Sequence, residues 1–184
     1  MPEIFSLDVD TLGDLKPLNQ VVFSLGSNQG DSIEILQAAV DRLAETPNLI
    51  MVDVSSVYRT TPVDNVDQPD FLNIVVIADS TLEPLTLLQR CQAIEDAYGR
   101  VRDPGNPHGP RTLDIDLIQV GSRSADSEEL ILPHPRAQQR AFVLVPWLEI
   151  DRRAALPAGS VDDLVATMDT SGVSRLRDVS IIKS

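Results

Sequence analysis

The sequence predicts an α+β fold in which helices cover one face of an antiparallel sheet and the other face stays free. Apolar β-rich runs end at glycine, proline or polar residues, and two other segments have helical periodicity. Along the chain these elements follow the order strand, helix, strand, strand, helix, strand. A chain of 184 residues, with 42% hydrophobic and 23% charged residues, is long enough for one such domain with its own core.

The first strand and the first helix are marked at both ends. Residues 20–26, QVVFSLG, form a short apolar run that stops at glycine, which predicts a strand. Asp31 with Glu34 three residues later is typical of a helix capping box. The apolar side chains that then recur at helical spacing, until Pro47, predict an amphipathic helix: Ile33, Leu36, Val40 and Leu43.

Two β-rich runs and a second helix follow. Residues 49–58 and 71–78 predict strands, and the polar loop between them, RTTPVDNVDQPD, has a length that is more often functional than not. Pro84 opens a helix for which Gly99 is the expected end. Its apolar stripe is Leu87, Cys91, Ile94 and Tyr98, and its polar face carries Gln89, Gln92, Glu95 and Asp96. The lone Cys91 is therefore expected to be a buried hydrophobe.

A strand at residues 113–120, in GPRTLDIDLIQVG, completes the βαββαβ order of a ferredoxin-like fold. The expected C-terminal additions are a helix around residues 141–150, a helix near 161–168 and a β-like run, VSIIK. Residues 1–18 are acidic and lack strong periodicity. We therefore expect an N-terminal extension or linker over 1–18 and a single domain over 19–184.

The charge of the chain excludes some classes of partner. With 28 acidic against 15 basic residues, the formal net charge is -13, which argues against nucleic acid or an anionic membrane as the main partner. The sequence has no apolar run of about 18 residues and no charged start followed by an apolar core. We therefore expect that the chain has neither a membrane span nor a signal peptide and that it is cytoplasmic. A monomer is also expected.

Two aspartates mark the strand at 113–120. Asp114 and Asp116 alternate with apolar residues, so both carboxylates are expected on the same face of the sheet. Like charges placed so closely repel each other unless a cation lies between them. Mg²⁺ binds carboxylates together with phosphate oxygens and water, so a metal site is the functional interpretation. The alternative is an ordinary ion pair on an exposed sheet face.

Basic residues gather around this strand although the protein is acidic. Arg100 and Arg102 leave the second helix on an extended segment that should direct both the same way, and guanidinium groups bind phosphate. The alternatives are a solvated surface, or charges that complement the dipole of a helix C-terminus. Between positions 100 and 140 lie six arginines and both histidines: Arg100, Arg102, Arg111, Arg123, Arg136, Arg140, His108 and His134.

Aromatic and amide side chains complete the pattern. Phe71 and Asn73 share a strand face beside the long polar loop, and Phe142 lies two residues after Arg140. Two aromatic rings can enclose a flat heterocycle, and an amide can bind the edge of that heterocycle. Each phenylalanine alone is more often part of a core, so the functional interpretation depends on the neighbouring charges.

Five separated motifs, in this order and spacing, resemble the 6-hydroxymethyl-7,8-dihydropterin pyrophosphokinases of folate biosynthesis. The motifs are SLGSN, SSVYRTTPVDNVDQPDFLN, GRVR, GPRTLDIDLI and LPHPRAQQRAFVLVPWLEI, and the likeness covers about residues 20–150. It implies a ferredoxin-like α+β enzyme, a transferase of diphosphate groups. Such an enzyme moves diphosphate from ATP to the pterin hydroxymethyl oxygen and releases AMP.

The resemblance also implies roles for individual residues. Asp114 and Asp116 would hold two Mg²⁺ ions, with Arg100, Arg102 and Arg111 as further catalytic residues. The implied ATP-binding residues are Gln92, Glu95, Arg100, Arg102, His108, Arg111, His134 and Arg140. The implied pterin-binding residues are Thr60, Pro62, Val63, Phe71, Asn73 and Phe142. ATP and the pterin are the expected partners, and attachment to another folate-pathway domain stays open.

The clearest departure from the family pattern lies in one segment. In PGNPHGP, Pro107 and His108 occupy positions where the family usually has arginine followed by tryptophan, which predicts altered nucleotide contacts. Two alternatives to an active pyrophosphokinase remain. One is a degenerate family member with a weakened ATP lid, and the other is a two-metal nucleotidyl-transfer enzyme, which would need a basic nucleic-acid channel.

Overall fold

The computed structural model describes residues 15–62, 67–99, 105 and 112–183, and an antiparallel sheet lies at its centre. Within these residues the sheet has six strands, in the order β10-β3-β4-β1-β5 with β2 also paired to β4. The strands are β1 (Asn19–Ser27), β2 (Leu49–Val54), β3 (Tyr58–Thr60), β4 (Phe71–Ser80), β5 (Asp114–Val120) and β10 (Val173–Arg175). Residues 1–14 of the expected N-terminal extension lie outside the described ranges.

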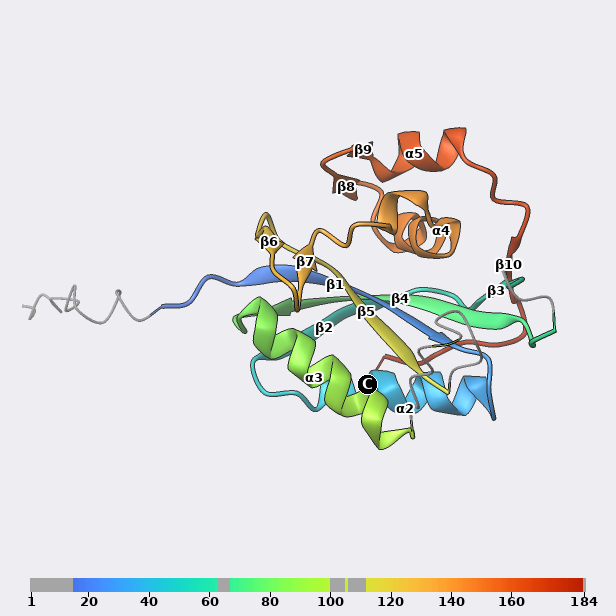
Figure 1. The fold of residues 1–184 in the computed structure, drawn as a ribbon, viewed down its shortest axis with the longest axis horizontal. Coiled ribbons are helices and arrows are strands. Elements are labelled where there is room, and N and C mark those ends of the chain that lie inside the picture. The colour runs from blue at the N-terminus through green and yellow to red at the C-terminus, as the bar shows by residue number, and fades with distance from the viewer. Residues whose placement is uncertain (1–14, 63–66, 100–104, 106–111, 184) are drawn as a thin grey trace, which may run out of the picture.

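Two helices, α2 (Ser32–Ala44) and α3 (Pro84–Ala97), cover one face of this sheet, as predicted (Figure 1). Alternate residues of β1 and β5 point toward them and are buried: Phe23, Leu25, Ile115 and Leu117. The predicted helix boundaries are confirmed. Asp31 Oδ1 accepts a hydrogen bond from Glu34 N at 3.1 Å, Pro84 is the first residue of α3, and Gly99 follows α3 with a φ of 68°. Cys91 is buried, as expected.

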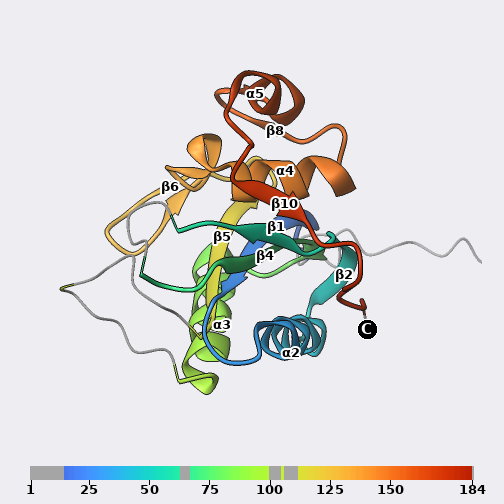
Figure 2. The ribbon, with the colours of Figure 1, turned by 90° about the vertical axis from the view of Figure 1, so that its right-hand side faces the viewer.

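The opposite face of the sheet is not free, and that expectation was wrong. Helix α4 (Ala141–Ile150) packs on this face, and α5 (Val161–Thr167) lies over α4 (Figure 2). Val22, Val75 and Ile118 of the sheet are buried in one cluster with α4 residues that include Leu144 and Trp147. The reason is that AFVLVPWLEI is apolar on nearly all sides, so it needs the sheet on one side and a second helix on the other.

Two predicted strands also differ. The run at 49–58 is divided into β2 and β3, because Ser55 forms an irregularity: its backbone N–H donates to Val75 O, and its Oγ accepts from Val75 N. The run VSIIK is not a strand. Instead, Gln37 of α2 binds both backbone groups of Ile182, at 2.8 and 2.9 Å, and Ile181 is buried in the core beside α2.

The remaining elements are short. They are β6 (Ala125–Asp126), β7 (Ile131–Leu132), the 3-10 helix η1 (Ala137–Gln139), β8 (Ala155–Leu156) and β9 (Gly159–Ser160). None of the helices in the described ranges has both the length and the apolar character that crossing a bilayer requires.

Candidate active site

The two aspartates of β5 lie on the sheet face that carries α4. Ile115 and Leu117 point into the core beneath α2 and α3, so Asp114 and Asp116 alternate to the other side, where both are half-buried. In the register of β5 against β1, Asp114 pairs with Gly26 and Asp116 with Ser24. Both carboxylates therefore share a face next to a position of β1 that has no side chain.

Arg140 connects these carboxylates to α4. Its Nη1 lies 3.2 Å from Asp116 Oδ2, and the side chains of Arg140 and Asp116 are 22% and 28% exposed. The same guanidinium lies over the ring of Phe142, with Cζ 5.4 Å from the ring centroid. Because Arg140 is the residue that precedes α4, the start of this helix brings a cation to Asp116 and an aromatic ring to that cation.

His134 lies beside this group as a neutral imidazole. Its backbone N–H donates to Ile118 O at 2.8 Å, which fixes the residue on β5. Burial, together with the positive charges of Arg140 and Arg136, lowers the pKa of His134 to about 4, although Asp114 acts in the opposite direction. Its Nδ1 accepts a hydrogen bond from Arg136 N at 3.2 Å, so the ring proton belongs on Nε2, as a donor.

A polar group of β3 and β4 lies on the same sheet face. Asn73 of β4 donates from Nδ2 to Thr60 Oγ1 of β3, and both residues are buried. Thr60 pairs with Phe71 in the register of the two strands, and Phe71 is half-buried. The predicted side chains Thr60, Phe71 and Asn73 therefore come together, and Asn73 is held in one orientation.

Gly26 is a residue of this site that the sequence analysis missed. It lies between Asp114 on one neighbouring strand and Asn73 on the other. A Cβ atom at position 26 would lie only 2.8 Å from Asn73 Oδ1. The available signal was a glycine inside an otherwise apolar strand, which often marks a close approach.

The structure corrects the place of Glu95. We expected this residue on the polar face of its helix, but it is only 3% exposed, and its Oε1 accepts a hydrogen bond from Ile115 N at 2.7 Å. Position 95 lies beside the Cys91 and Ile94 stripe, so it points under β5, where the edge of the sheet leaves a backbone N–H to be satisfied. Gln92, by contrast, is exposed.

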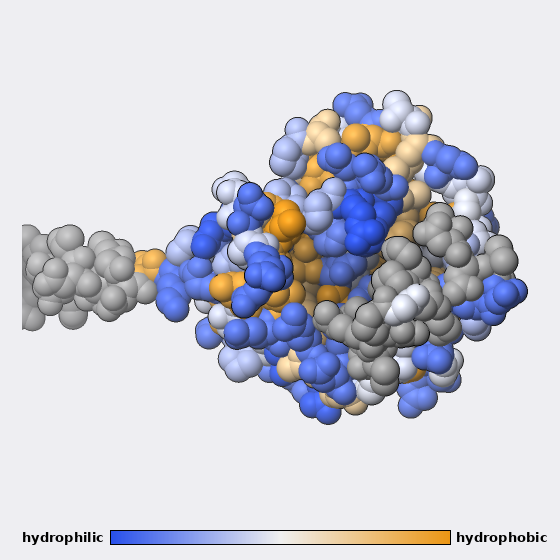
Figure 3. Space-filling model, in the orientation of Figure 1, coloured by the Kyte–Doolittle hydropathy of each residue, from blue (hydrophilic) through white to orange (hydrophobic). Residues whose placement is uncertain are grey.

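Several predicted residues are not brought together or cannot be placed. Arg123 Nη2 donates to Glu83 Oε2 at 2.8 Å in an exposed ion pair, away from the aspartates, and Arg136 is exposed. Pro62 is half-buried at the end of a described range. The residues that lie outside the described ranges are Val63, Arg100, Arg102, His108 and Arg111. Figure 3 shows strongly hydrophilic side chains gathered on one face of the molecule, with apolar side chains on either side of them.

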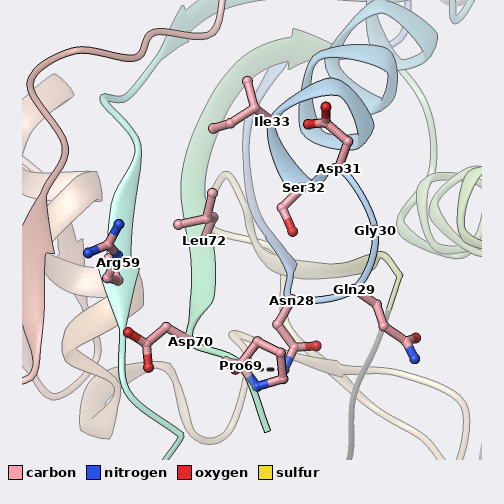
Figure 4. Close-up of a pocket in the computed structure, with 10 residues that line it drawn as sticks. All are labelled: Asn28, Gln29, Gly30, Asp31, Ser32, Ile33, Arg59, Pro69, Asp70 and Leu72. Carbon is pink, nitrogen blue, oxygen red and sulfur yellow. Dashed lines mark hydrogen bonds between the residues drawn. The ribbon is translucent and has the colours of Figure 1, made fainter.

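A separate hollow of about 500 Å³ opens where β1 meets α2 (Figure 4). Arg59 and Leu72, which pair across β3 and β4, line it from the sheet. Its floor includes Asn28, whose Nδ2 donates to Gln68 Oε1 at 2.9 Å and to Pro69 O at 3.0 Å. Asn28 thus ties the loop after β1 to the end of the loop that leads into Phe71.

Comparison with known proteins agrees with this geometry. The family model described as 7,8-dihydro-6-hydroxymethylpterin-pyrophosphokinase (HPPK) matches residues 22–152. A 2-amino-4-hydroxy-6-hydroxymethyldihydropteridine pyrophosphokinase of Methylorubrum extorquens is 40% identical over 86% of this chain and 99% of that protein. Proteins of the same name from Pseudomonas aeruginosa and Bacillus subtilis are 40% and 38% identical over 86% and 79% of this chain, and over 98% and 86% of their own lengths.

Solved structures share the fold at much lower identity. Wild-type Plasmodium falciparum HPPK-DHPS with SDX-DHP matches with a TM-score of 0.63 and 14% identity, over 83% of this chain. This chain spans 45% of that protein's length, so the likeness establishes the fold and does not extend to the whole of that protein. The architecture is ferredoxin-like, and by its family match and its relatives the chain belongs to the HPPK family.

Proposed function

We propose that this protein transfers diphosphate from ATP to the hydroxymethyl oxygen of 6-hydroxymethyl-7,8-dihydropterin and releases AMP, a step of folate biosynthesis. Membership of the HPPK family and the shared name of the relatives support this function. The main supporting observation is that one face of the sheet carries two carboxylates, an arginine, and the hydrogen-bonded pair Asn73 and Thr60 with aromatic residues nearby.

Asp114 and Asp116 suit magnesium as ligands. Mg²⁺ prefers oxygen ligands such as carboxylates. In proteins this ion is commonly held by one or two carboxylates together with phosphate oxygens and water. Among the residues that the structure describes, no group of three or more His, Cys, Asp and Glu side chains gathers as a metal cluster. We infer that this chain offers the two aspartates and that ATP and water complete the coordination, with two ions as the proposed number. Bound Mg²⁺ would neutralise the triphosphate and make the substrate hydroxyl more acidic.

Arg140 and His134 are the proposed phosphate-binding residues of the described chain. Arg140 is bound to Asp116 at 3.2 Å, and a phosphate oxygen is an equivalent anionic partner for its guanidinium. His134 is neutral and presents an N–H donor, so it can bind a phosphate oxygen without adding charge. The predicted contributions of Gln92, Glu95, Arg100, Arg102, His108 and Arg111 belong to the same proposal.

The pterin is proposed to lie between Phe71 and Phe142. Asn73 and Thr60 are buried beside Phe71, and a fixed amide can bind the hydrogen-bonding edge of a flat heterocycle. Phe142 approaches from the opposite layer, because it belongs to α4 while Phe71 belongs to the sheet. Pro62 and Val63 are proposed to complete this wall.

The proposed chemistry needs alignment and charge neutralisation and no covalent nucleophile. The hydroxymethyl oxygen forms a bond to the β-phosphorus of ATP and gives up its proton to water, while the bond from that phosphorus to the oxygen shared with the α-phosphorus breaks and AMP leaves. Arg140 and His134 hold the phosphates, and Phe71 and Phe142 hold the acceptor. These contacts bring the two reacting atoms together.

The proposal is tested by removing the carboxylates. The double variant D114N/D116N should lose Mg²⁺-dependent AMP formation while the circular dichroism spectrum and the Tm stay close to those of the native protein. The exposed Asp178, replaced as Asp178→Asn, is the matched control and should keep full activity. Undiminished AMP formation by the double variant would contradict the metal assignment, and pterin and ATP binding without AMP in the native protein would indicate a degenerate enzyme.

A further inference from the structure

Glu149, near the end of α4, joins three segments of the chain that are distant in sequence. Its Oε1 accepts a hydrogen bond from Ser56 N at 2.6 Å, and its Oε2 accepts one from Tyr58 Oη at 2.9 Å. Arg175 of β10 adds an ion pair, with its Nε 3.6 Å from Glu149 Oε2. One carboxylate therefore connects α4 to the segment between β2 and β3, to the first residue of β3, and to β10.

The helix side of this connection leads to the proposed pterin site. Phe142 and Glu149 are seven residues apart on α4, which is two helical turns, so both side chains lie on nearly the same side of the helix. The distance along the axis is about 10 Å at the usual rise per residue. Anchoring Glu149 therefore fixes the rotation of α4, and that rotation decides where the ring of Phe142 points.

The contact of Glu149 with Tyr58 also leads to residues of the proposed pterin site. Tyr58 is directly opposite Asn73 in the pairing of β3 with β4, and Asn73 binds Thr60, two residues after Tyr58. Tyr58 is 6% exposed, so its hydroxyl depends on Glu149 for a partner in a buried position. The Glu149 contacts thus join the helix that carries Phe142 to the strand that carries Thr60.

The Arg175 contact differs in strength from the other two. The Arg175 side chain is 60% exposed, and ion pairs in such positions contribute little. It also lies beyond residues 22–152, the range that the family model matches. The two hydrogen bonds from Ser56 and Tyr58 are therefore the ones on which the position of α4 depends.

We propose that Glu149 is a positioning residue for the acceptor: by binding Ser56 N and Tyr58 Oη it holds α4 against β3 and sets the gap between Phe142 and the Phe71, Asn73 and Thr60 group. This inference rests on the proposed function. Arg140, on the phosphate-binding side, keeps a contact of its own with Asp116 when Glu149 is lost. The loss of Glu149 should change acceptor binding more than ATP binding.

The test compares three variants with the native protein, at a temperature well below the lowest Tm of the set. Glu149→Ala removes both hydrogen bonds, Glu149→Gln keeps an oxygen acceptor and an amide that can donate to the tyrosine oxygen, and Tyr58→Phe removes one hydroxyl. Glu83→Ala, which breaks an exposed ion pair elsewhere, is the matched control. KM for the pterin, KM for ATP, kcat and Tm are measured for each.

For Glu149→Ala we expect the pterin KM to rise about tenfold while the ATP KM changes by less than about twofold. Glu149→Gln should restore most of the affinity for the pterin, Tyr58→Phe should be intermediate, and Glu83→Ala should match the native protein. A purely structural role would lower Tm and the active fraction and leave both KM values unchanged, and that result would overturn the inference. If Glu149→Ala does not fold, Tyr58→Phe decides by the same comparison of KM values. A native protein that forms no AMP would contradict the proposed function itself, and this inference with it.

Discussion

Asp116 Oδ2 and Arg140 Nη1 lie 3.2 Å apart, and this ion pair joins the aspartate strand to the start of α4. The pair balances charge on a half-buried face, where an isolated carboxylate would be costly. It also holds the arginine next to the place where Mg²⁺ and triphosphate are proposed to bind. Arg140 therefore has two anionic partners available, Asp116 and the nucleotide.

Replacing Arg140 should weaken both the binding of ATP and the reaction. For Arg140→Ala we expect kcat/KM for ATP to fall about 100-fold, because a positioned cation next to developing phosphate charge is removed. Arg140→Lys should recover only part of this loss, since an ammonium group cannot bind two oxygens in the planar geometry of guanidinium. Steady-state kinetics check the prediction, with Arg152→Ala at an exposed position as the control. An unchanged ATP dependence in Arg140→Ala would contradict it.

His134 should make the stability of the protein depend on pH. Its folded-state pKa is about 4, below the ordinary value of 6.5, so the unfolded chain takes up the proton first as the pH falls. The free energy of unfolding therefore decreases as the pH falls from about 6.5 to 4. Above about pH 6.5, His134 causes no such decrease. Urea unfolding at several pH values should show a smaller loss of the unfolding free energy in His134→Gln than in the native protein. Identical pH profiles would contradict the assignment of a neutral histidine.

Tyr58 should titrate late. Burial, followed by the hydrogen bond to Glu149 and its charge, raises the pKa of the Tyr58 phenol to about 12 from 10.0, and Arg175 opposes this slightly. Because the folded-state value lies above the unfolded one, the associated stability is complete below pH 10 and is lost as the pH rises toward 12. Absorbance of the phenolate in Tyr98→Phe, which leaves Tyr58 as the remaining tyrosine of the chain's two, measures the titration directly. Ionisation near pH 10 in the folded protein would be inconsistent with the contact to Glu149.

Gly26→Ala should affect the pterin side selectively. The new Cβ would lie 2.8 Å from Asn73 Oδ1, and Asn73 is buried and bound to Thr60, so the amide must leave its position. We expect the pterin KM to rise about tenfold, with a smaller effect on ATP. At Gly172 the nearest atom to an added Cβ is Thr61 Oγ1 at 3.3 Å, a less severe approach, so Gly172→Ala is the control. Equal behaviour of the two variants would contradict a positioning role for Gly26.

Much of the site could be predicted because it depends on local alternation. Asp114 and Asp116 share a face for the same reason that Ile115 and Leu117 share the other, and Phe71 with Asn73 follows the same rule. Arg140 and Phe142 were noticed as a cation and an aromatic ring two residues apart, and the roles that the family resemblance implies for them stay a prediction. In each case a short stretch of sequence determines the relationship between the side chains.

Relationships between distant segments could not be predicted in this way. The free sheet face was a wrong expectation because the pattern of AFVLVPWLEI does not state which surface will cover it. Glu95 was expected on the polar face of its helix. Its hydrogen-bond partner, Ile115 N, belongs to a distant strand, and the sequence does not show that this strand lies at the edge of the sheet. Glu149 and Gly26 were missed for the same reason. The role of Glu149 depends on Tyr58, and the role of Gly26 depends on Asn73, each in a segment distant in sequence.

This site is proposed to move diphosphate as one unit from ATP to the pterin. The most direct measurement is to incubate the protein with ATP, Mg²⁺ and 6-hydroxymethyl-7,8-dihydropterin and to quantify every product by chromatography. We expect AMP and pterin diphosphate in equal amounts. ADP with a pterin monophosphate, or AMP formed without a modified pterin, would contradict this proposal.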